Sequence, residues 1–274
     1  LPIFQIYTPS EHDDSLKIVQ DLRQLGKDMS KSWQGKVPEK VAMLPREIMA
    51  DKAFKDQRVL DLLNHRDILL GYDKESAEPV GVDLTENGFF TIFSDNYVQD
   101  ERILATVKRS FNQLKGVTRY LVKTSEDEVP YGPNTFDQVI DKKGVVAFFN
   151  TIKQESQKRK INQDHSPIYI LVVNAHLLGA ILGQNEDDFR SLLLTAKQVG
   201  IDFFMIGSFK SFTANYGGVD KALKNSTTVG ALGVRFHDQS IAKVNSKYSE
   251  PAMKEDELSY FDGMTGLRIR LLTE

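Results

Sequence analysis

Residues 88–114 constrain the fold of this chain more than any other stretch. Gly88 breaks the preceding pattern, and residues 89–93 form a five-residue apolar run typical of strands that are buried on both faces. Eight mainly polar residues follow, and apolar residues then recur at the spacing of an amphipathic helix. A buried strand, a polar loop and a helix in this order are the frame of a P-loop, whose consensus GxxxxGK[ST] would lie between the strand and the helix.

The polar interval lacks the residues on which P-loop chemistry depends. A nucleotide-binding loop needs glycines so that backbone amides can approach phosphate oxygens, a lysine to neutralise those oxygens, and a hydroxyl for Mg²⁺. In this chain Gln99 replaces the second glycine, Asp100 the lysine and Glu101 the hydroxyl residue. The degenerate loop as a whole consists of Ser94, Asp95, Asn96, Tyr97, Val98, Gln99, Asp100 and Glu101.

The exchange of lysine for aspartate decides how this loop is interpreted. An unlike charge pair at about 4 Å is worth roughly 4 kcal/mol at an effective dielectric constant near about 20, so the attraction becomes a repulsion of similar size. Asp100 and Glu101 would instead favour the positive end of the following helix. We therefore predict a loop that is closed to ATP. The competing interpretation is an ordinary strand–loop–helix unit with an acidic first helical turn, which is common in α/β domains.

A second buried strand shows a similar loss. In P-loop ATPases such a strand ends in acidic residues that hold Mg²⁺ and orient the attacking water. Here the apolar run 168–173 ends in Asn174 and Ala175. Asn174 has the shape of aspartate without its charge, and Ala175 can polarise nothing. A strand ending in these two residues is unremarkable by itself, but together with the altered loop it predicts a degenerate acidic-strand motif.

The remaining pattern predicts an α/β fold with a mainly parallel sheet and helices on both faces. Strands and helices alternate, and no repeat or linker divides the chain. We therefore predict a single domain, with a lead-in helix and strap over residues 1–50 and an α/β core over residues 51–274. Predicted helices cover residues 15–33, 51–64, 135–141, 145–160 and 186–199, and predicted strands cover residues 68–72, 79–84, 89–93, 120–122, 168–173, 203–207, 229–236 and 267–272.

Composition excludes several classes of function. The net charge is −3, which is no electrostatic footprint for nucleic acid. The chain has no cysteine, and its five histidines lack metal-ligand spacing, so we expect no metal site. No apolar run is long enough to cross a bilayer. The chain begins at Leu1 without a signal sequence, so we expect it to be a piece of a longer protein whose membrane anchor lies elsewhere.

Several short motifs in a fixed order give the chain a family resemblance. The motifs are Trp33-Gln34-Gly35-Lys36-Val37-Pro38, Met43-Leu44-Pro45, Leu70-Gly71-Tyr72-Asp73, Pro79-Val80-Gly81-Val82-Asp83, residues 169–176, residues 197–202 and residues 233–240. With these motifs in this order, the chain resembles, over nearly its whole length, the C-terminal ATPase-like domain of the EssC family, the coupling proteins of type VIIb secretion systems within the FtsK/SpoIIIE group of translocating ATPases.

The resemblance implies a three-layer RecA/FtsK-like P-loop fold, with Ser208 in the region where this group carries a polar sensor. It implies a domain on the cytoplasmic face of the cell membrane, anchored only by segments outside this chain. Its partners would be neighbouring ATPase domains of the same chain and secreted small helical-hairpin proteins with a Trp-x-Gly turn. Substrate segments would bind as amphipathic helices in an apolar groove, for which exposed-looking apolar residues between Phe209 and Tyr216 are candidates.

Three functions compete. The preferred hypothesis is a non-hydrolysing ATPase-like domain without catalytic residues or bound ATP/Mg²⁺ that acts in substrate recognition and in regulation of export, a process linked to virulence. The alternative is an active P-loop ATPase with an unusual nucleotide site that powers secretion. DNA translocation, the third, would require salt-sensitive affinity for duplex DNA, and the acidic pI of about 6.0 argues against it.

Overall fold

The computed structural model describes residues 14–33, 35, 43–127, 129, 131–214, 218–244 and 250–274. The chain divides into two compact units, Leu1–Val41 and Ala42–Glu274. This boundary lies within the predicted lead-in segment, so residues 43–50 belong to the second unit. The prediction of a single domain stays a prediction.

The described part of the first unit is dominated by helix α1, Ser15–Ser32, as predicted to within one residue. Asp14 caps the helix because its side chain accepts a hydrogen bond from the backbone N–H of Leu16, at 2.9 Å. None of its residues is buried, and Leu16 and Met29 are 73% and 63% exposed. Val41 and Ala42 of the predicted strap lie outside the described residues.

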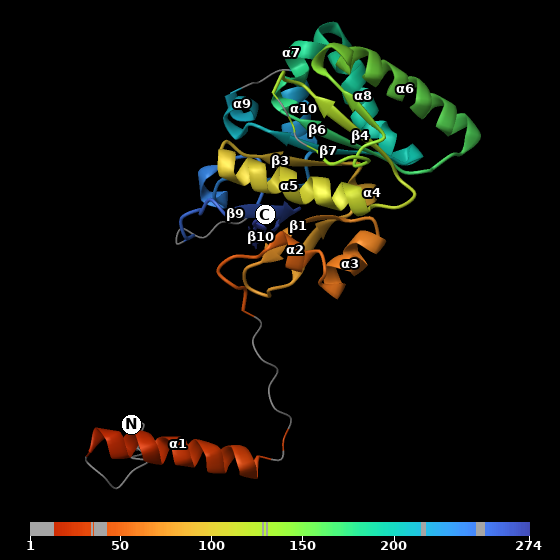
Figure 1. Cartoon of the computed structure of the whole chain (residues 1–274). Helices are drawn as coiled ribbons and strands as arrows, with labels where there is room; N and C mark the ends of the chain where they lie inside the picture. The colour runs from red at the N-terminus through yellow and green to blue at the C-terminus, as the bar shows by residue number, and fades with distance from the viewer. Residues whose placement is uncertain are drawn as a thin grey trace. The chain divides into compact units, whose positions relative to one another are not determined.

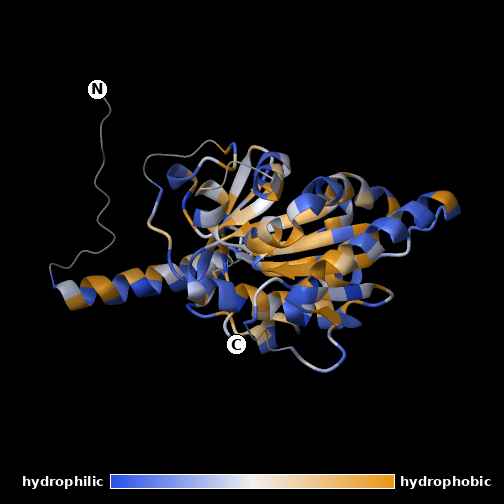
Figure 2. Cartoon of the chain, turned by 90° about the horizontal axis from the view of Figure 1, so that it is seen from above, coloured by the Kyte–Doolittle hydropathy of each residue, from blue (hydrophilic) through white to orange (hydrophobic). Residues whose placement is uncertain are grey.

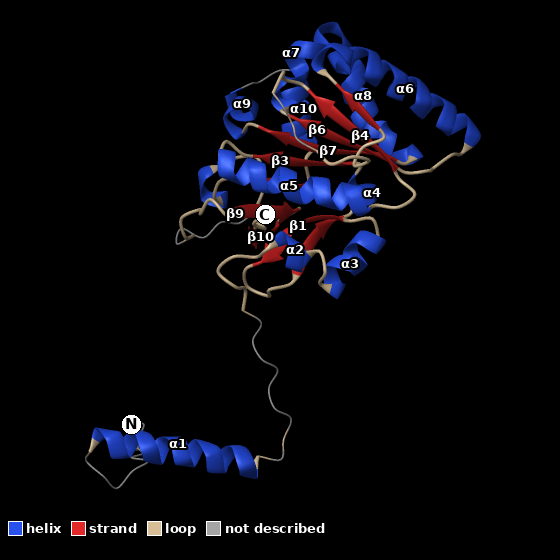
Figure 3. Cartoon of the chain, viewed as in Figure 1, coloured by secondary structure: helices blue, strands red, loops and turns tan. Residues whose placement is uncertain are grey.

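The second unit is built on one ten-stranded sheet with the strand order β2-β1-β10-β9-β8-β3-β7-β6-β4-β5 (Figures 1 and 3). The six strands from β8 to β5 run parallel, and β9, β10, β1 and β2 continue the sheet with antiparallel pairing. The strands are β1 (Ile68–Asp73), β2 (Pro79–Val82), β3 (Phe89–Phe93), β4 (Thr118–Lys123), β5 (Gln138–Ile140), β6 (Ile168–Val173), β7 (Ile201–Gly207), β8 (Val229–Leu232), β9 (Glu257–Asp262) and β10 (Thr265–Arg270).

Helices cover both faces of this sheet, as predicted. The remaining helices are α2 (Ala50–Ala53), α3 (Gln57–Asn64), α4 (Leu84–Asn87), α5 (Tyr97–Gln113), α6 (Val145–Asn162), α7 (Leu178–Leu182), α8 (Glu186–Thr195), α9 (Phe209–Ala214) and α10 (Gly218–Ser226). Short 3-10 turns occupy Lys142–Gly144, Ala175–Leu177, Gly183–Asn185, Ala196–Val199 and Phe236–Asp238.

Alternating residues of the central strands feed two separate cores. Phe90 and Ile92 of β3 pack with the apolar face of α5, whereas Phe89 and Phe93 pack with α6, α7, α8 and α10 on the other face. The strands are accordingly the most continuously hydrophobic part of the molecule (Figure 2). Burial on both faces explains why β3 and β6 form unbroken apolar runs, and it produces the three-layer architecture.

Several predicted elements differ from the structure. The helix predicted over residues 51–64 is split into α2 and α3, because the side chain of Asp56 caps a new helix by accepting from the N–H of Arg58, at 3.0 Å. Residues 138–140 form the edge strand β5 instead of part of a helix. Strand β9 was not predicted, and it pairs with β10 in an antiparallel hairpin. Among the described residues, no helix has both the length and the apolarity that a membrane span requires.

Candidate functional site at the carboxyl edge of the parallel strands

The loop after β3 is shorter than predicted. It comprises three residues, Ser94–Asn96, because α5 begins at Tyr97. Asn96 ends the loop as the helix cap, since its Oδ1 accepts from the N–H groups of Val98 at 2.9 Å and Gln99 at 3.3 Å. Residues 97–101 therefore lie in the helix. The spacing of Asn96 and Gln99 is that of a capping-box sequence, a signal that would have placed this helix start correctly.

The cap occupies backbone N–H donors at the start of α5. A P-loop binds phosphate through free amides at the start of its helix. Here the amides of Val98 and Gln99 point at the side chain of Asn96, and the amide of Asn96 donates to Ser94 Oγ at 3.1 Å. The anion-binding geometry of the helix start is thus used within the loop itself.

Gln99, which stands at the position of the second P-loop glycine, fills the space behind the loop. Its side chain is buried, with 1% of the residue exposed. Its Oε1 accepts from Ser94 Oγ at 2.9 Å, and its Nε2 donates to the carbonyl oxygen of Glu257 at 2.9 Å. Longer contacts of 3.4 Å reach the carbonyl oxygens of Gly233 and Lys254. A Cβ on Gly233 would lie 2.4 Å from Gln99 Oε1, so the strand end and the amide need this glycine.

Asp95 and Ser208 are brought together, although they are far apart in sequence. The carboxylate of Asp95 accepts from Ser208 Oγ at 2.6 Å and from the backbone N–H of Lys210 at 3.0 Å. It therefore caps the start of α9. The backbone N–H of Ser208 donates to Nδ1 of His176 at 3.0 Å. His176 thus has a structural role, because it links the end of β7 to the segment after β6.

Burial shifts the pKa values of two side chains at this edge, Asp100 and His176. Burial raises the pKa of Asp100 to about 6; the nearby hydroxyl of Ser94 opposes this rise and the charge of Asp95 adds to it. One carboxylate oxygen of Asp100 has no hydrogen-bond partner. The expected stabilisation of an ionised Asp100 by the helix end is thus outweighed by desolvation. Burial also lowers the pKa of His176, against the opposing charge of Asp95, which suits its role as a hydrogen-bond acceptor.

Asn174 and Ala175 lie at the same edge of the sheet, but Asn174 contacts the segment after β4 and Ala175 is buried. Asn174 has a left-handed backbone, with φ 58° and ψ 42°. Its Nδ2 donates to Ser125 Oγ at 2.8 Å, and its carbonyl oxygen accepts from Thr124 Oγ1 at 2.7 Å. Both partners follow β4, so Asn174 joins two strand ends and makes no hydrogen bond to the loop after β3. Ala175 is completely buried.

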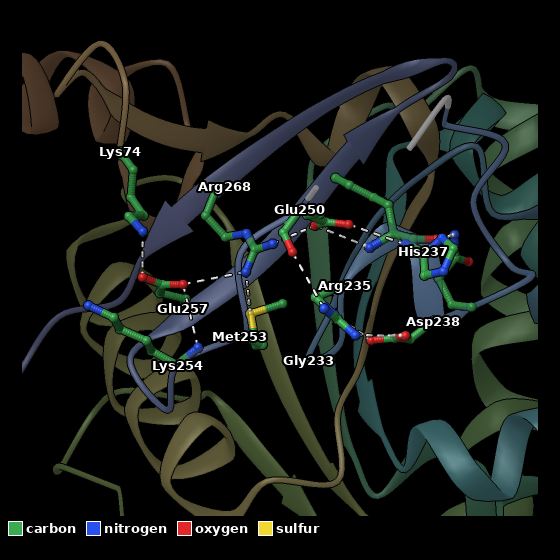
Figure 4. A network of polar contacts seen from close by, with 12 residues as sticks. Lys74, Gly233, Arg235, His237, Asp238, Glu250, Met253, Lys254, Glu257 and Arg268 are labelled. Atoms are coloured by element: carbon green, nitrogen blue, oxygen red, sulfur yellow. Dashed lines mark hydrogen bonds and ion pairs between the residues drawn. The ribbon is translucent and has the colours of Figure 1, made fainter. Parts of the chain in front are cut away.

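Glu257, whose carbonyl oxygen accepts from Gln99, also belongs to a network of ion pairs and hydrogen bonds (Figure 4). The carboxylate of Glu257, a residue that is 1% exposed, contacts Lys74 Nζ at 2.6 Å and Arg268 at 3.4 Å. Arg268 also contacts Glu250 and Met253 Sδ. Burial alone would raise the pKa of Glu257, but the hydrogen bond and charge of Lys74, with a smaller contribution from Arg268, hold this pKa below its ordinary value. No local sequence pattern indicates this network.

The arrangement connects strand ends rather than presenting ligands. Within the described ranges, no cluster of acidic or histidine side chains has the geometry to hold a metal ion. The side chains of residues 94–99 and 208 are engaged with one another or with neighbouring backbone, except for those of Tyr97, which is 76% exposed, and Val98. Ligands of α/β proteins bind at this edge of a parallel sheet, and here the polar groups of the loop bond to one another.

No protein-family model matches the chain. The chain is 20% identical over 279 residues to the type VII secretion system protein EssC of Staphylococcus aureus (strain MRSA252), covering 98% of this chain and 18% of that protein. It therefore spans less than a fifth of the length of this relative.

Solved structures of the same kind share the fold. EssC ATPases 2 and 3 from Geobacillus thermodenitrificans superpose with a TM-score of 0.69 and 16% identity, covering 98% of this chain and 53% of that one. The cytoplasmic domain of EssC gives 0.66 and 15%, with coverages of 98% and 56%. Thermomonospora curvata EccC, ATPases 2 and 3 in complex with a signal sequence peptide, gives 0.64 and 14%, with coverages of 96% and 50%. The chain is thus similar in sequence to EssC of type VII secretion systems and has the fold of EssC and EccC ATPase domains, as its ordered motifs predicted.

Proposed function

We propose that this chain is a non-hydrolysing ATPase-like domain of a type VII secretion coupling protein, acting in substrate recognition and in regulation of protein export. The observation that carries the proposal is the side chain of Gln99, which is buried and hydrogen-bonded to Ser94 and Glu257 at the residue where the P-loop consensus has a glycine. No bound ATP or Mg²⁺ is expected in this domain.

The energetic argument follows from the contacts of the loop. A triphosphate could reach the amides of Val98 and Gln99 only after Asn96 released them. Displacing Gln99 would leave buried donors and acceptors without partners, at a cost of about 1–3 kcal/mol for each. The carboxylates of Asp95 and Asp100 would also repel the phosphates, and the sequence has an aspartate at residue 100, where the P-loop consensus has its lysine.

The role in substrate recognition is supported by likeness. Thermomonospora curvata EccC has been solved with a signal sequence peptide, and EssC ATPases 2 and 3 lie in one chain. We therefore propose that this domain binds segments of secreted helical-hairpin proteins on the cytoplasmic face of the membrane, beside further ATPase domains of its own protein. Nucleic acid is not a proposed partner.

The candidate residues for a substrate groove between Phe209 and Tyr216 fit this role poorly. Phe212 is completely buried and Phe209 packs against the same core, so neither offers an open apolar surface. Tyr216 lies outside the described residues. A substrate surface is therefore proposed elsewhere in the domain, as argued in the next subsection.

Nucleotide titration tests the proposal directly. Isothermal calorimetry with Mg-ATP, run beside a phosphate-release assay, should show neither saturable binding nor turnover at millimolar nucleotide. The double variant Gln99→Gly and Asp100→Lys, which restores two consensus residues, provides a matched comparison. Saturable binding or phosphate release by the unaltered chain would overturn the proposal in favour of an active ATPase with an unusual site.

A further inference from the structure

A surface cavity in the described part of the chain lies between α8 and α10, away from the loop. Its volume is about 360 Å³. Its apolar floor is formed by Phe89 at the start of β3, Leu193 of α8 and Leu223 of α10. Surface cavities of roughly 300–1,000 Å³ are large enough to take a ligand or a group of side chains from a partner.

The walls of the cavity are two helices with an apolar residue on the rim. Leu194, which also lines the cavity, is 65% exposed. A large apolar side chain at the edge of an apolar floor gains free energy when a partner covers it, at about 25 cal/mol per Å² of area removed from water. Two helices flanking an apolar floor form the type of groove into which an amphipathic helix is laid.

The charges around this cavity favour one kind of partner. The ionisable residues that line it in the described part of the chain are Arg190 and Lys221, both cationic, and the carboxylate of Glu186 lies against Gly218 at one end of the cavity. Arg190 makes an exposed ion pair with Asp187 at 3.1 Å, a residue outside the lining. Exposed pairs of this kind contribute little and can be exchanged for a partner's carboxylate. Lys221 has no ion-pair partner among the described residues.

We propose that the groove between α8 and α10 binds an acidic amphipathic helix of a protein partner, whose apolar side chains enter the cavity while its carboxylates pair with Arg190 and Lys221. This inference rests on the substrate-recognition part of the proposed function and specifies the partner by its charge. It is independent of the closed loop, because none of residues 94–101 lines the cavity. A nucleotide titration and a peptide titration can therefore fail separately.

The test uses two synthetic helical peptides that share one leucine stripe at helical spacing. The positions that flank the stripe carry glutamate in one peptide and lysine in the other. Both are labelled and titrated with the full chain by fluorescence anisotropy. We expect the glutamate peptide to bind tighter by about tenfold or more, as expected for carboxylates that pair with cations beside a desolvated groove.

Charge reversal makes the test specific to the groove. In the double variant Arg190→Glu and Lys221→Glu the preference should invert in favour of the lysine peptide, whereas Leu194→Ser should weaken both peptides. Lys158→Glu, an exposed position on α6, is the matched control and should change nothing. Equal binding of the two peptides, no binding of either, or a preference that survives the reversal would overturn the proposal. So would displacement of the glutamate peptide by an equal concentration of inorganic phosphate, which would indicate a site for free anions.

Discussion

Two carboxylates in the sheet are buried to the same extent but have opposite surroundings. Glu257 at the start of β9 and Asp202 near the start of β7 are each 1% exposed. Glu257 has a hydrogen bond from Lys74 and the charge of Arg268, which hold its pKa below the ordinary value against burial. Neither oxygen of Asp202 has a hydrogen-bond partner, and burial raises its pKa to about 8.

At equal burial, the hydrogen-bond and ion-pair partners of a carboxylate decide the direction in which its pKa shifts and whether its charged form stabilises the fold. The charge of Asp83 raises the pKa of Asp202 further, and the opposing charge of Lys197 is too weak to reverse the effect. Glu257 lies at the edge that resembles a nucleotide site, where its carbonyl oxygen also accepts from Gln99. At the carboxyl edge the side chains of Gln99 and Glu257 are therefore paired, although one oxygen of Asp100 lacks a partner, whereas at the opposite end of the parallel strands both oxygens of Asp202 lack one.

The largest effect is expected for Glu257→Gln, which removes the paired charge but keeps the shape of the side chain. Breaking a buried ion pair by removing one partner typically costs about 3–5 kcal/mol, because the remaining charges are left desolvated. Lys74 is partly exposed, so we expect about 3 kcal/mol of lost unfolding free energy, measured by urea denaturation. Glu255→Gln, an exposed neighbour, is the control. A loss below about 0.5 kcal/mol for Glu257→Gln, the range of surface substitutions, would contradict the argument.

For Asp202→Asn we expect a smaller change in unfolding free energy, and a gain instead of a loss. The pKa of Asp202 is raised from 3.8 to about 8 in the folded state, so the folded chain binds this proton more tightly than the unfolded chain. The contribution of the protonated Asp202 to the unfolding free energy is fully present below a pH of about 4 and is lost as the pH rises toward about 8. The variant should therefore exceed the unaltered chain in stability at alkaline pH, on the order of 2 kcal/mol after allowance for burying an amide.

Unfolding curves between mildly acidic and alkaline pH measure this difference. The stability gain of Asp202→Asn should grow with pH and vanish toward acid, whereas Asp127→Asn at an exposed position should show no such trend. A gain that is independent of pH would mean that ionisation of Asp202 is not its origin.

The same contrast explains which parts of the structure could be predicted from the sequence. Strands β3 and β6 were predicted at their observed bounds, because burial on both faces leaves an unbroken apolar run. The start of α5 was misplaced, because it depends on one side chain, that of Asn96, whose capping role was not considered. Strand β9 was not predicted, because its sequence Glu257–Asp262 contains two acidic residues and a serine and has no continuous apolar run.

From the sequence, only the edge of the sheet at which the candidate site lies could be predicted, not the side-chain contacts within it. Parallel strands place their carboxyl ends at one edge, so Ser208 was expected near the loop, and it contacts Asp95. The ion pair of Lys74 with Glu257 joins residues 183 positions apart, and nothing in the local sequence indicates it. The left-handed backbone of Asn174, which turns this residue toward the end of β4, also depends on tertiary contacts.

The smallest effect tests a group that has partners but is only half buried. Asn96 accepts from two amides at the start of α5, and replacing such a cap by alanine costs about 1 kcal/mol, mainly through the amides that lose their acceptor. We expect Asn96→Ala to lower the unfolding free energy by about that amount and Asn96→Asp to retain it, because aspartate caps equally well and favours the helix end. Urea denaturation of both variants provides the measurement. If Asn96→Ala lost as much stability as Glu257→Gln, then pairing alone, without burial, would set the size of these effects. If Asn96→Asp lost as much as Asn96→Ala, then the nearby carboxylates of Asp95 and Asp100 would outweigh the cap, and the loop would be more sensitive to negative charge than its hydrogen bonds imply.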